Sequence, residues 1–180
     1  MGEGGVGAVN HLLRPRDVLV PSDYVDQSIR RDVELEGGYL LVMREALCSE
    51  LRGILRETAE EVGGSRVFER GIYLVTDGHH FESPAEIGFY RLSGADVVGQ
   101  SLCPEVYLAR EIGACYASLQ LVVNMAEGVV APWQHAELAD LFRGEGERIG
   151  RMLLLALARV PDKRNCRCGQ LRQPTLLRME

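Results

Sequence analysis

The stretch that decides the fold is residues 73–124, which run YLVTDGHHFESPAEIGFYRLSGADVVGQSLCPEVYLAREIGACYASLQLVVN. Three apolar runs within it end in small or polar residues, at Asp77-Gly78, at Gln100-Ser101 and at Asn124. In an open α/β sheet, ligands bind beyond the carboxyl ends of the strands. The pattern therefore predicts a polar small-molecule site where these three ends meet.

Two helix starts separate these runs. Ser83 can cap a helix, Pro84 then stands at its first position, and Glu86 can return a hydrogen bond to the cap. Pro104 opens a second helix, which Gly113 closes. Strands that alternate with helices in this way predict a three-layer α/β fold.

The rest of the chain is divided by the same signals. Residues 2–7 are too rich in glycine to form a regular element, and the polar residues 22–38 predict a long loop. Regular elements are expected elsewhere, with strands at 17–21, 40–43, 66–76, 95–99 and 115–123, a helix capped by Ser49 and stopped at Gly63, and a long helix over 135–160.

Length and charge limit the class of protein. The chain has 180 residues, of which 46% are hydrophobic and 26% charged. These values predict one globular domain, residues 1–180, with a core over about 1–160 and a basic, solvated tail over 161–180. The net charge of −6 argues against a nucleic-acid partner, because phosphate binding needs clustered Lys and Arg.

Targeting signals are not evident. No window is long and apolar enough to span a membrane, and residues 1–10 lack the apolar run of a signal peptide. The five cysteines, without a secretory context, agree with a reducing compartment. We therefore expect a cytoplasmic protein with no membrane partner.

The cysteines fall into two groups. Three of them lie in apolar surroundings and are expected in the core: Cys48, Cys103 and Cys115. Cys166 and Cys168 form a Cys-Arg-Cys pair that could serve redox or metal chemistry, although two Cys alone cannot complete a zinc site. A structural role for this pair is the simpler interpretation, and we expect neither a metal ion nor an organic cofactor.

Phe81, Glu82 and Asn124 carry groups that suit a purine base. The amide of Asn124 supplies two donors and one acceptor for a purine edge. Phe81 can stack on a base, and Glu82 can accept a hydrogen bond from a ring N–H. Each residue also has a purely structural explanation, as a turn-forming Asn, a hydrophobic staple and a favourable charge at a helix N-terminus.

Ser101 and the histidine pair are further candidates. Ser101 places a hydroxyl beside the helix that Pro104 opens, where an anion can bind, although a loop Ser that helps to cap this helix is the alternative. His79 and His80 could bind a metal ion, but adjacent residues rarely direct both rings at one ion. No spaced ligand set such as HExxH accompanies them, so a surface loop is the favoured interpretation.

At these residues the chain resembles the trimeric purine nucleoside phosphorylase and 5′-methylthioadenosine phosphorylase family. The phrases are DGHHFESPAEI and GADVVGQSLCPEVYLAREIGACYASLQLVVN, which are similar to the family's EGPRFETPAEI and GADVVGMT-x-x-PEVVLARELG-x-CYAS. The earlier GVGAVNHLLRPRDVLVPSDYVD is similar to a second family pattern, so the resemblance runs from about Gly5 to the long helix. It implies the family's three-layer αβα fold with a mixed central sheet.

The resemblance also implies a reaction, the phosphorolysis of a purine nucleoside to the free base and ribose 1-phosphate. Inorganic phosphate is then a co-substrate, and Asn124 both binds the purine and stabilises it as the leaving group. In the family, Asn at this position accompanies 6-oxopurine bases and Asp accompanies adenine, so the resemblance implies a 6-oxopurine or 5′-methylthio-purine nucleoside as substrate. The family pattern assigns base binding to Phe81, Glu82 and Asn124, phosphate binding to Gly5 and Ser101, and ribose binding to Gln100 and His135.

The sequence also departs from the family pattern. The family's first third, which carries a phosphate-gripping loop and an Arg-His pair, has no counterpart here, so we expect a fold truncated at its N-terminus. His79-His80 replaces Pro-Arg, and Leu40 stands where a site histidine is often found. Cys166 and Cys168 resemble the terminal Cys-x-Cys of some methylthio-nucleoside phosphorylases.

Three hypotheses follow for the function. The first is a purine nucleoside phosphorylase, expected to be a trimer or hexamer because family active sites often borrow residues from neighbouring subunits. The second is a non-catalytic purine-binding or assembly member of the same fold. The third and weakest is a metal-dependent hydrolase that uses the pair His79-His80.

Overall fold

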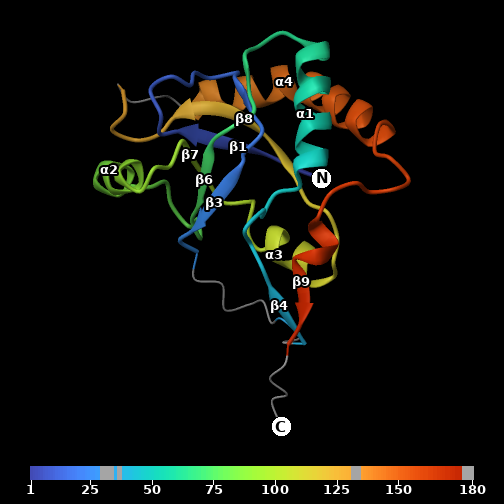
Figure 1. Ribbon diagram of the computed structural model, residues 1–180. Coiled ribbons are helices and arrows are strands. Elements are labelled where there is room, and N and C mark those ends of the chain that lie inside the picture. Colours follow the sequence, from blue (N-terminus) through green and yellow to red (C-terminus); the bar gives the residue numbers. More distant parts are fainter. Residues whose placement is uncertain (29–34, 36–37, 131–134, 176–180) are drawn as a thin grey trace.

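A twisted β-sheet flanked by helices forms the body of the chain, as the computed structural model in Figure 1 shows. The structure describes residues 1–28, 35, 38–130 and 135–175, and for His135 the backbone alone. The expected α/β class is confirmed. Among the described residues, no helix has the length and apolar character needed to cross a membrane.

The main sheet has seven strands and is mixed. In spatial order they are β3 (Asp23–Asp26), β6 (Ile72–Val75), β7 (Val97–Gly99), β1 (Gly2–Ala8), β8 (Ser118–Met125), β2 (Val18–Leu19) and β5 (Val67–Phe68). Strand β1 is antiparallel to β7 and parallel to β8. The strands β7 and β8 therefore run in opposite directions on the two sides of β1.

Four helices and a small second sheet complete the fold. The helices are α1 (Ser49–Val62), α2 (Pro84–Leu92), α3 (Glu105–Glu111) and α4 (His135–Ala158). The second sheet pairs β4 (Tyr39–Leu41) with β9 (Arg172–Pro174), beside α3 in Figure 1. The predicted capping box of α2 is confirmed, because Ser83 Oγ accepts from the Glu86 backbone N–H at 3.3 Å and the Glu86 carboxylate accepts from the Ser83 N–H at 2.7 Å.

Side chains alternate across the sheet and build cores on its two faces. On one face, Val97 of β7 and Val122 of β8 pack with Val106 of α3. On the other face, α1 and α4 cover β2 and β8. Helix α2 lies on that same second face, where it packs against Leu74 of β6 and Val98 of β7. Helices thus cover both faces, which is the layered arrangement that the sequence predicts (Figure 1).

The prediction that residues 2–7 form no regular element is wrong. They form β1, which lies in the middle of the sheet. Their glycines are needed because neighbouring atoms come very close. A Cβ on Gly4 would lie 2.6 Å from Ser101 Oγ, and one on Gly5 would lie 2.4 Å from Phe142 Cζ. Pairing with β8 from Gly2 to Ala8 offsets the entropic cost that glycine brings.

Three smaller predictions also need correction. The expected loop 22–38 contains the edge strand β3, whose exposed Asp side chains suit an edge position, and part of this loop lies outside the described residues. The segment 66–76 forms two strands, because Val67–Phe68 pairs with β2 at one edge of the sheet and Ile72–Val75 pairs with β3 and β7 at the other end. The N-cap of α1 is Cys48, not Ser49, and no side chain caps this helix. The Cys48 backbone N–H donates to the carbonyl of Tyr116 at 2.7 Å.

The end of the chain is not simply a solvated tail. Cys168 and Leu171 are buried, with exposed fractions of 4% and 8%, and strand β9 pairs with β4. The basic residues of this segment favoured the interpretation as a solvated tail, and its apolar contacts could not be recognised from the sequence. Residues 166–174 therefore belong to the packed part of the structure.

Candidate functional site

A cavity of about 330 Å³ lies on the sheet face that carries α1, α2 and α4. Its volume is within the range of small-molecule sites. The cavity lies between two parts of the core. Val123 belongs to the part under α4, and Val98 and Ala126 belong to the part under α2. The residues that line it are Gly4, Gly5, Gly7, Phe81, Glu82, Val98, Gly99, Gln100, Ser101, Val123, Asn124, Ala126, Glu127, Leu138 and Phe142.

Strand β1 contributes backbone to this cavity. Only Gly7 and Ala8 of β1 pair with β7, so the β7-side edge of the strand at Gly4 and Gly5 is not covered by another described strand. Both glycines line the cavity. Main-chain N–H groups and small residues at such an edge can approach an anion closely.

A β-bulge aims Asn124 at the cavity. The register of β1 against β8 shifts so that Val6 is opposite Val122 while Gly7 is opposite Asn124, which leaves Val123 as the extra residue. Val122 packs on the α3 side of the sheet, whereas both Val123 and Asn124 line the cavity on the other side. Without the bulge, strict alternation would place Asn124 on the same side as Val122.

The amide of Asn124 is buried and oriented. Its exposed fraction is 8%, and Nδ2 donates to the carbonyl oxygen of Met125 at 3.0 Å. An amide nitrogen carries two N–H groups. One of them therefore holds the side chain in place, and the second can serve a ligand.

Glu82 and Phe81 form the wall next to α2. Glu82 is 8% exposed, and one of its carboxylate oxygens accepts a hydrogen bond from Thr76 Oγ1 at 2.6 Å. The Thr76 N–H donates to Gly99 at 3.0 Å, which ties this contact to the end of β7. Phe81 is 55% exposed and also lines the cavity.

Ser101 is held by a buried tyrosine. The Tyr73 hydroxyl lies 3.2 Å from Ser101 Oγ and accepts from the Ser101 N–H at 3.3 Å. Tyr73 is fully buried, and burial raises its pKa against the opposing effect of the hydrogen bonds with Ser101. The phenol is therefore neutral at physiological pH and can donate its proton to Ser101 Oγ, which leaves the serine proton available to an anion.

The structure brings most of the candidate residues together. Six of the seven line this one cavity: Gly5, Phe81, Glu82, Gln100, Ser101 and Asn124. His135 begins α4, but its side chain lies outside the described residues. The three strand ends do not all point the same way, because β7 and β8 run in opposite directions on the two sides of β1. Gln100 and Ser101 after β7 and Asn124 near the end of β8 nevertheless line one cavity, whereas Asp77 and Gly78 are not among its lining residues.

Sequence reasoning missed the contribution of α4. Leu138 and Phe142 line the cavity from this helix, and Glu127 lines it from the segment after β8. Leu138 and Phe142 are four residues apart and so lie on one helix face. That spacing was visible in the sequence, but nothing in it said which part of the sheet the helix would cover.

The histidine pair lies in an exposed loop. His79 has a positive φ of 69°, and His80 Nδ1 lies 2.7 Å from the carbonyl of Phe81. In the described part of the chain, neither histidine belongs to a cluster of three or more side chains able to hold a metal ion. The geometry therefore gives no support to the metal-dependent hydrolase hypothesis.

Residues 3–158 match the family model described as the phosphorylase superfamily. The chain belongs to the phosphorylase superfamily. It is 34% identical to the probable 6-oxopurine nucleoside phosphorylase of Korarchaeum cryptofilum, over 91% of this chain and 66% of that protein. It is 31% identical to the S-methyl-5′-thioadenosine phosphorylase of Pyrococcus abyssi, over 92% of this chain and 65% of that protein.

Two solved structures of another phosphorylase share the fold of this chain. Methylthioadenosine phosphorylase from Schistosoma mansoni in complex with adenine has a TM-score of 0.80 at 22% identity, over 90% of this chain and 65% of that chain. The same enzyme in complex with tubercidin has a TM-score of 0.78 at 24% identity, over 87% of this chain and 63% of that chain. This phosphorylase-superfamily chain spans about two thirds of the length of the curated relatives that it matches.

Proposed function

We propose that this chain binds a purine nucleoside in the cavity beside β1 and catalyses its phosphorolysis. The observation that carries the proposal is the convergence of an aromatic ring, a carboxylate, an amide and a hydroxyl, from Phe81, Glu82, Asn124 and Ser101, on one cavity. The ring, the carboxylate and the amide can bind a heteroaromatic base, and the serine hydroxyl can bind an anion. The curated relatives named as nucleoside phosphorylases support the same reaction.

The base is proposed to lie between Phe81 and Asn124. Stacking of a base on an aromatic ring contributes about 1–3 kcal/mol. A 6-oxopurine presents a ring N–H that the buried carboxylate of Glu82 can accept, and it presents acceptors at O6 and N7 that the free N–H of Asn124 can serve. This pairing of donors with acceptors favours a 6-oxopurine over adenine.

The chemistry follows from these positions. A phosphate oxygen forms a bond to C1′ of the ribose while the bond from C1′ to the purine N9 breaks, and the electron pair of that bond goes to the purine. A donor near N7 stabilises the negative charge that the base gains in the transition state. Asn124 is the residue proposed for this role. Ser101 and the backbone of Gly4 and Gly5 are proposed to hold phosphate, with Gln100 beside the ribose.

The apolar side chains that α4 contributes to the cavity would favour some 5′ substituents of the nucleoside over others. Leu138 and Phe142 line the cavity, and Phe142 is 46% exposed. Such side chains would contact a methylthio group more favourably than a charged substituent. The substrates proposed are therefore inosine-like nucleosides and their 5′-methylthio analogues, with His135 as a further candidate ribose contact.

A second candidate function is purine binding without turnover. One observation favours this second function. None of the described residues that line the cavity is a Lys or an Arg. Without a cation, phosphate would be held only by a hydroxyl and main-chain N–H groups. Such a protein would bind the base through the same residues but would not cleave the nucleoside.

One assay tests the function. The chain is incubated with inosine in the presence and absence of phosphate, and free hypoxanthine is measured by chromatography. Phosphorolysis requires hypoxanthine release only with phosphate, together with an equal amount of ribose 1-phosphate. Release that is equal without phosphate would contradict the proposal. Calorimetric binding of hypoxanthine with no turnover would instead support the second candidate.

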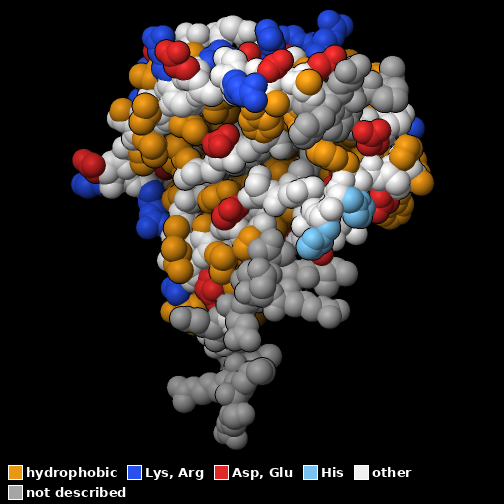
Figure 2. Space-filling view, turned by 180° about the vertical axis from the view of Figure 1, so that it is seen from behind, with side chains coloured by type: hydrophobic (Ala, Val, Ile, Leu, Met, Phe, Trp, Pro, Cys, Tyr) orange, Lys and Arg blue, Asp and Glu red, His pale blue; other side chains and the backbone are white. Residues whose placement is uncertain are grey.

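We also propose that the chain forms a homo-oligomer. Large apolar side chains are exposed on two helices, with exposed fractions of 61% and 86% for Phe89 and Leu92 of α2, and 69% and 55% for Leu154 and Leu157 of α4. Figure 2 shows hydrophobic side chains spread over one face of the molecule, with charged side chains densest along its upper rim and others scattered over the face. Sedimentation velocity tests the proposal, and a stable monomer at micromolar concentration would contradict it.

A further inference from the structure

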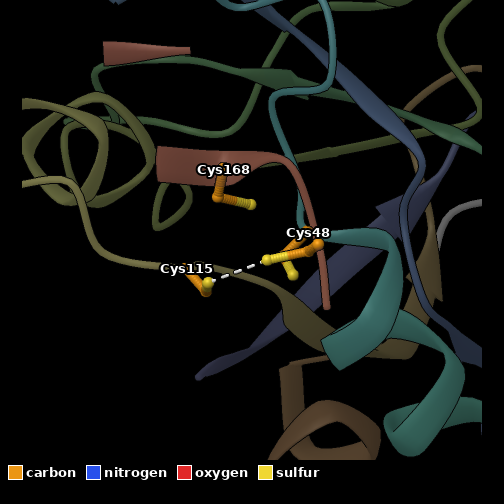
Figure 3. Close-up of side chains that lie close together, drawn as sticks. Cys48, Cys115 and Cys168 are labelled. Atoms are coloured by element: carbon orange, nitrogen blue, oxygen red, sulfur yellow. Dashed lines mark hydrogen bonds between the residues drawn. The ribbon is translucent and has the colours of Figure 1, made fainter. Parts of the chain in front are cut away.

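Four of the five cysteines come together from separate parts of the chain. They are Cys48 at the start of α1, Cys115 between α3 and β8, and Cys166 and Cys168 in the segment after α4. All four Sγ atoms lie within 4.8 Å of one another. Figure 3 shows the side chains of Cys48, Cys115 and Cys168 pointing toward one another from three different segments.

We propose that these four cysteines form a structural zinc site. Zinc bound by four thiolates is tetrahedral, with Zn–S bonds of about 2.3 Å, which places the sulfurs about 3.8 Å apart. The four sulfurs of this cluster lie within 4.8 Å, and the Sγ atoms of Cys115 and Cys166 are 3.3 Å apart. Small side-chain rotations would bring them to the corners of such a tetrahedron.

The compactness of the whole cluster favours a metal ion over disulfides. A disulfide needs two sulfurs in contact and places no demand on any other pair. Here every sulfur is close to the other three, and this is the arrangement that a single central ion requires. No histidine or carboxylate takes part, so the ligand set is soft and suits zinc rather than magnesium or calcium.

The surrounding residues fit a site with negative charge. A zinc ion with four thiolates carries a net charge of −2. The buried guanidinium of Arg110 donates to the carbonyl of Cys168 at 3.1 Å, and its Nε has no hydrogen-bond partner among the described residues. Arg164 and Arg172 line a surface cavity together with Cys166. These cations would stabilise a tetrathiolate complex electrostatically.

Hydrogen bonds already hold the contributing segments in place. The Cys48 N–H donates to Tyr116, the residue after Cys115, at 2.7 Å. Arg110 links the cysteine segment after α4 to the segment before α1, because it also donates to the carbonyl of Glu45 at 2.6 Å. Because all four coordination positions would be filled by protein, the site has no open position for catalysis, and its role would be to tie the end of the chain to the sheet and α1.

Metal analysis tests the site directly. The chain is purified with a reductant and without chelators, zinc is added, and excess metal is removed by gel filtration before elemental analysis. We expect one zinc per chain. The double variant Cys166→Ser/Cys168→Ser should bring zinc close to zero. Cys103→Ala is the matched control, because Cys103 is a buried cysteine outside the cluster, and it should retain one zinc per chain.

Spectroscopy on the unaltered chain covers the case in which the double variant fails to fold. Cobalt in place of zinc should give the visible bands of a tetrahedral ion and strong sulfur-to-metal charge transfer, and X-ray absorption should find four sulfurs at about 2.3 Å from zinc. Zinc far below one per chain in the reduced protein would overturn the proposal. Full zinc in the double variant, or disulfides among the four cysteines without zinc, would also overturn it.

Discussion

The hydroxyl of Tyr73 lies 3.2 Å from Ser101 Oγ and also accepts a hydrogen bond from the Ser101 backbone N–H at 3.3 Å. This one buried group thus fixes both the side chain and the main chain of the residue proposed to bind phosphate. Tyr73 reaches Ser101 from the core on the opposite face of the sheet, to which its ring belongs. It does not line the cavity and would act only through Ser101.

Tyr73→Phe should therefore weaken phosphate binding. The change leaves the Ser101 N–H without its partner and frees the serine side chain, at a cost of about 1–2 kcal/mol. We expect phosphate affinity, or its KM if the chain turns over, to worsen by about 5- to 30-fold, with hypoxanthine affinity unchanged. Titration calorimetry measures both. Tyr24→Phe is the matched control in the same core, and an equal loss in that variant would contradict the positioning role.

Asn124→Asp should alter base preference. The replacement exchanges an N–H donor for a carboxylate oxygen, which repels the O6 acceptor of a 6-oxopurine but can accept from the amino group of adenine. The ratio of hypoxanthine to adenine affinity should fall at least about tenfold, which corresponds to about 1.4 kcal/mol. Competition binding with the two bases measures this ratio. An unchanged ratio would mean that the amide does not face the purine edge.

Thr76→Val should weaken base binding without affecting phosphate. The hydroxyl of Thr76 donates to Glu82 at 2.6 Å and orients the carboxylate in the cavity wall. Its loss removes one hydrogen bond to a charged group, worth about 1.5–3 kcal/mol, so hypoxanthine affinity should fall by about tenfold or more. Thr58→Val is a control, since the hydroxyl of Thr58 donates to the carbonyls of Ile54 and Leu55 within α1 and Thr58 does not line the cavity. A selective loss of phosphate affinity in Thr76→Val would contradict the assignment of Glu82 to the base.

Gly4→Ala should displace Ser101. An added Cβ would stand 2.6 Å from Ser101 Oγ and 3.0 Å from Gln120 Oε1, both closer than ordinary contact. Phosphate binding should be lost, and the melting temperature should fall. Gly53→Ala is the control, because its added Cβ would meet no described atom within 4 Å apart from its chain neighbours and the backbone of its own helix, and the site is inside α1. That variant should gain about 0.5–1 kcal/mol in stability, and its phosphate binding should be unchanged.

The sequence was most informative where local signals act alone. The capping box at Ser83 and Glu86 satisfies backbone groups within one turn of helix, so it could be recognised without knowledge of the fold. The same holds for α4, whose length exceeds that of any strand. The motifs around Phe81 and Ser101 directed attention to the correct region, because six of the candidate residues line one cavity.

Long-range packing explains what the sequence did not reveal. The glycines of β1 are a loop signal by composition, and only the proximity of Ser101 and Phe142 makes them necessary in a central strand. The bulge at Val123 depends on pairing with β1 and leaves no mark in the sequence of β8. Cys48 and Cys115 are apolar-context cysteines by sequence, and only the fold places them beside Cys166.

The most direct test of the proposed purine site is a crystal structure of the chain with hypoxanthine. We expect the base to stack on Phe81, with its ring N–H toward Glu82 and its O6 and N7 edge toward Asn124. Hypoxanthine bound elsewhere on the surface, or a cavity that remains without the base at saturating concentration, would contradict the proposal that these three residues recognise a purine.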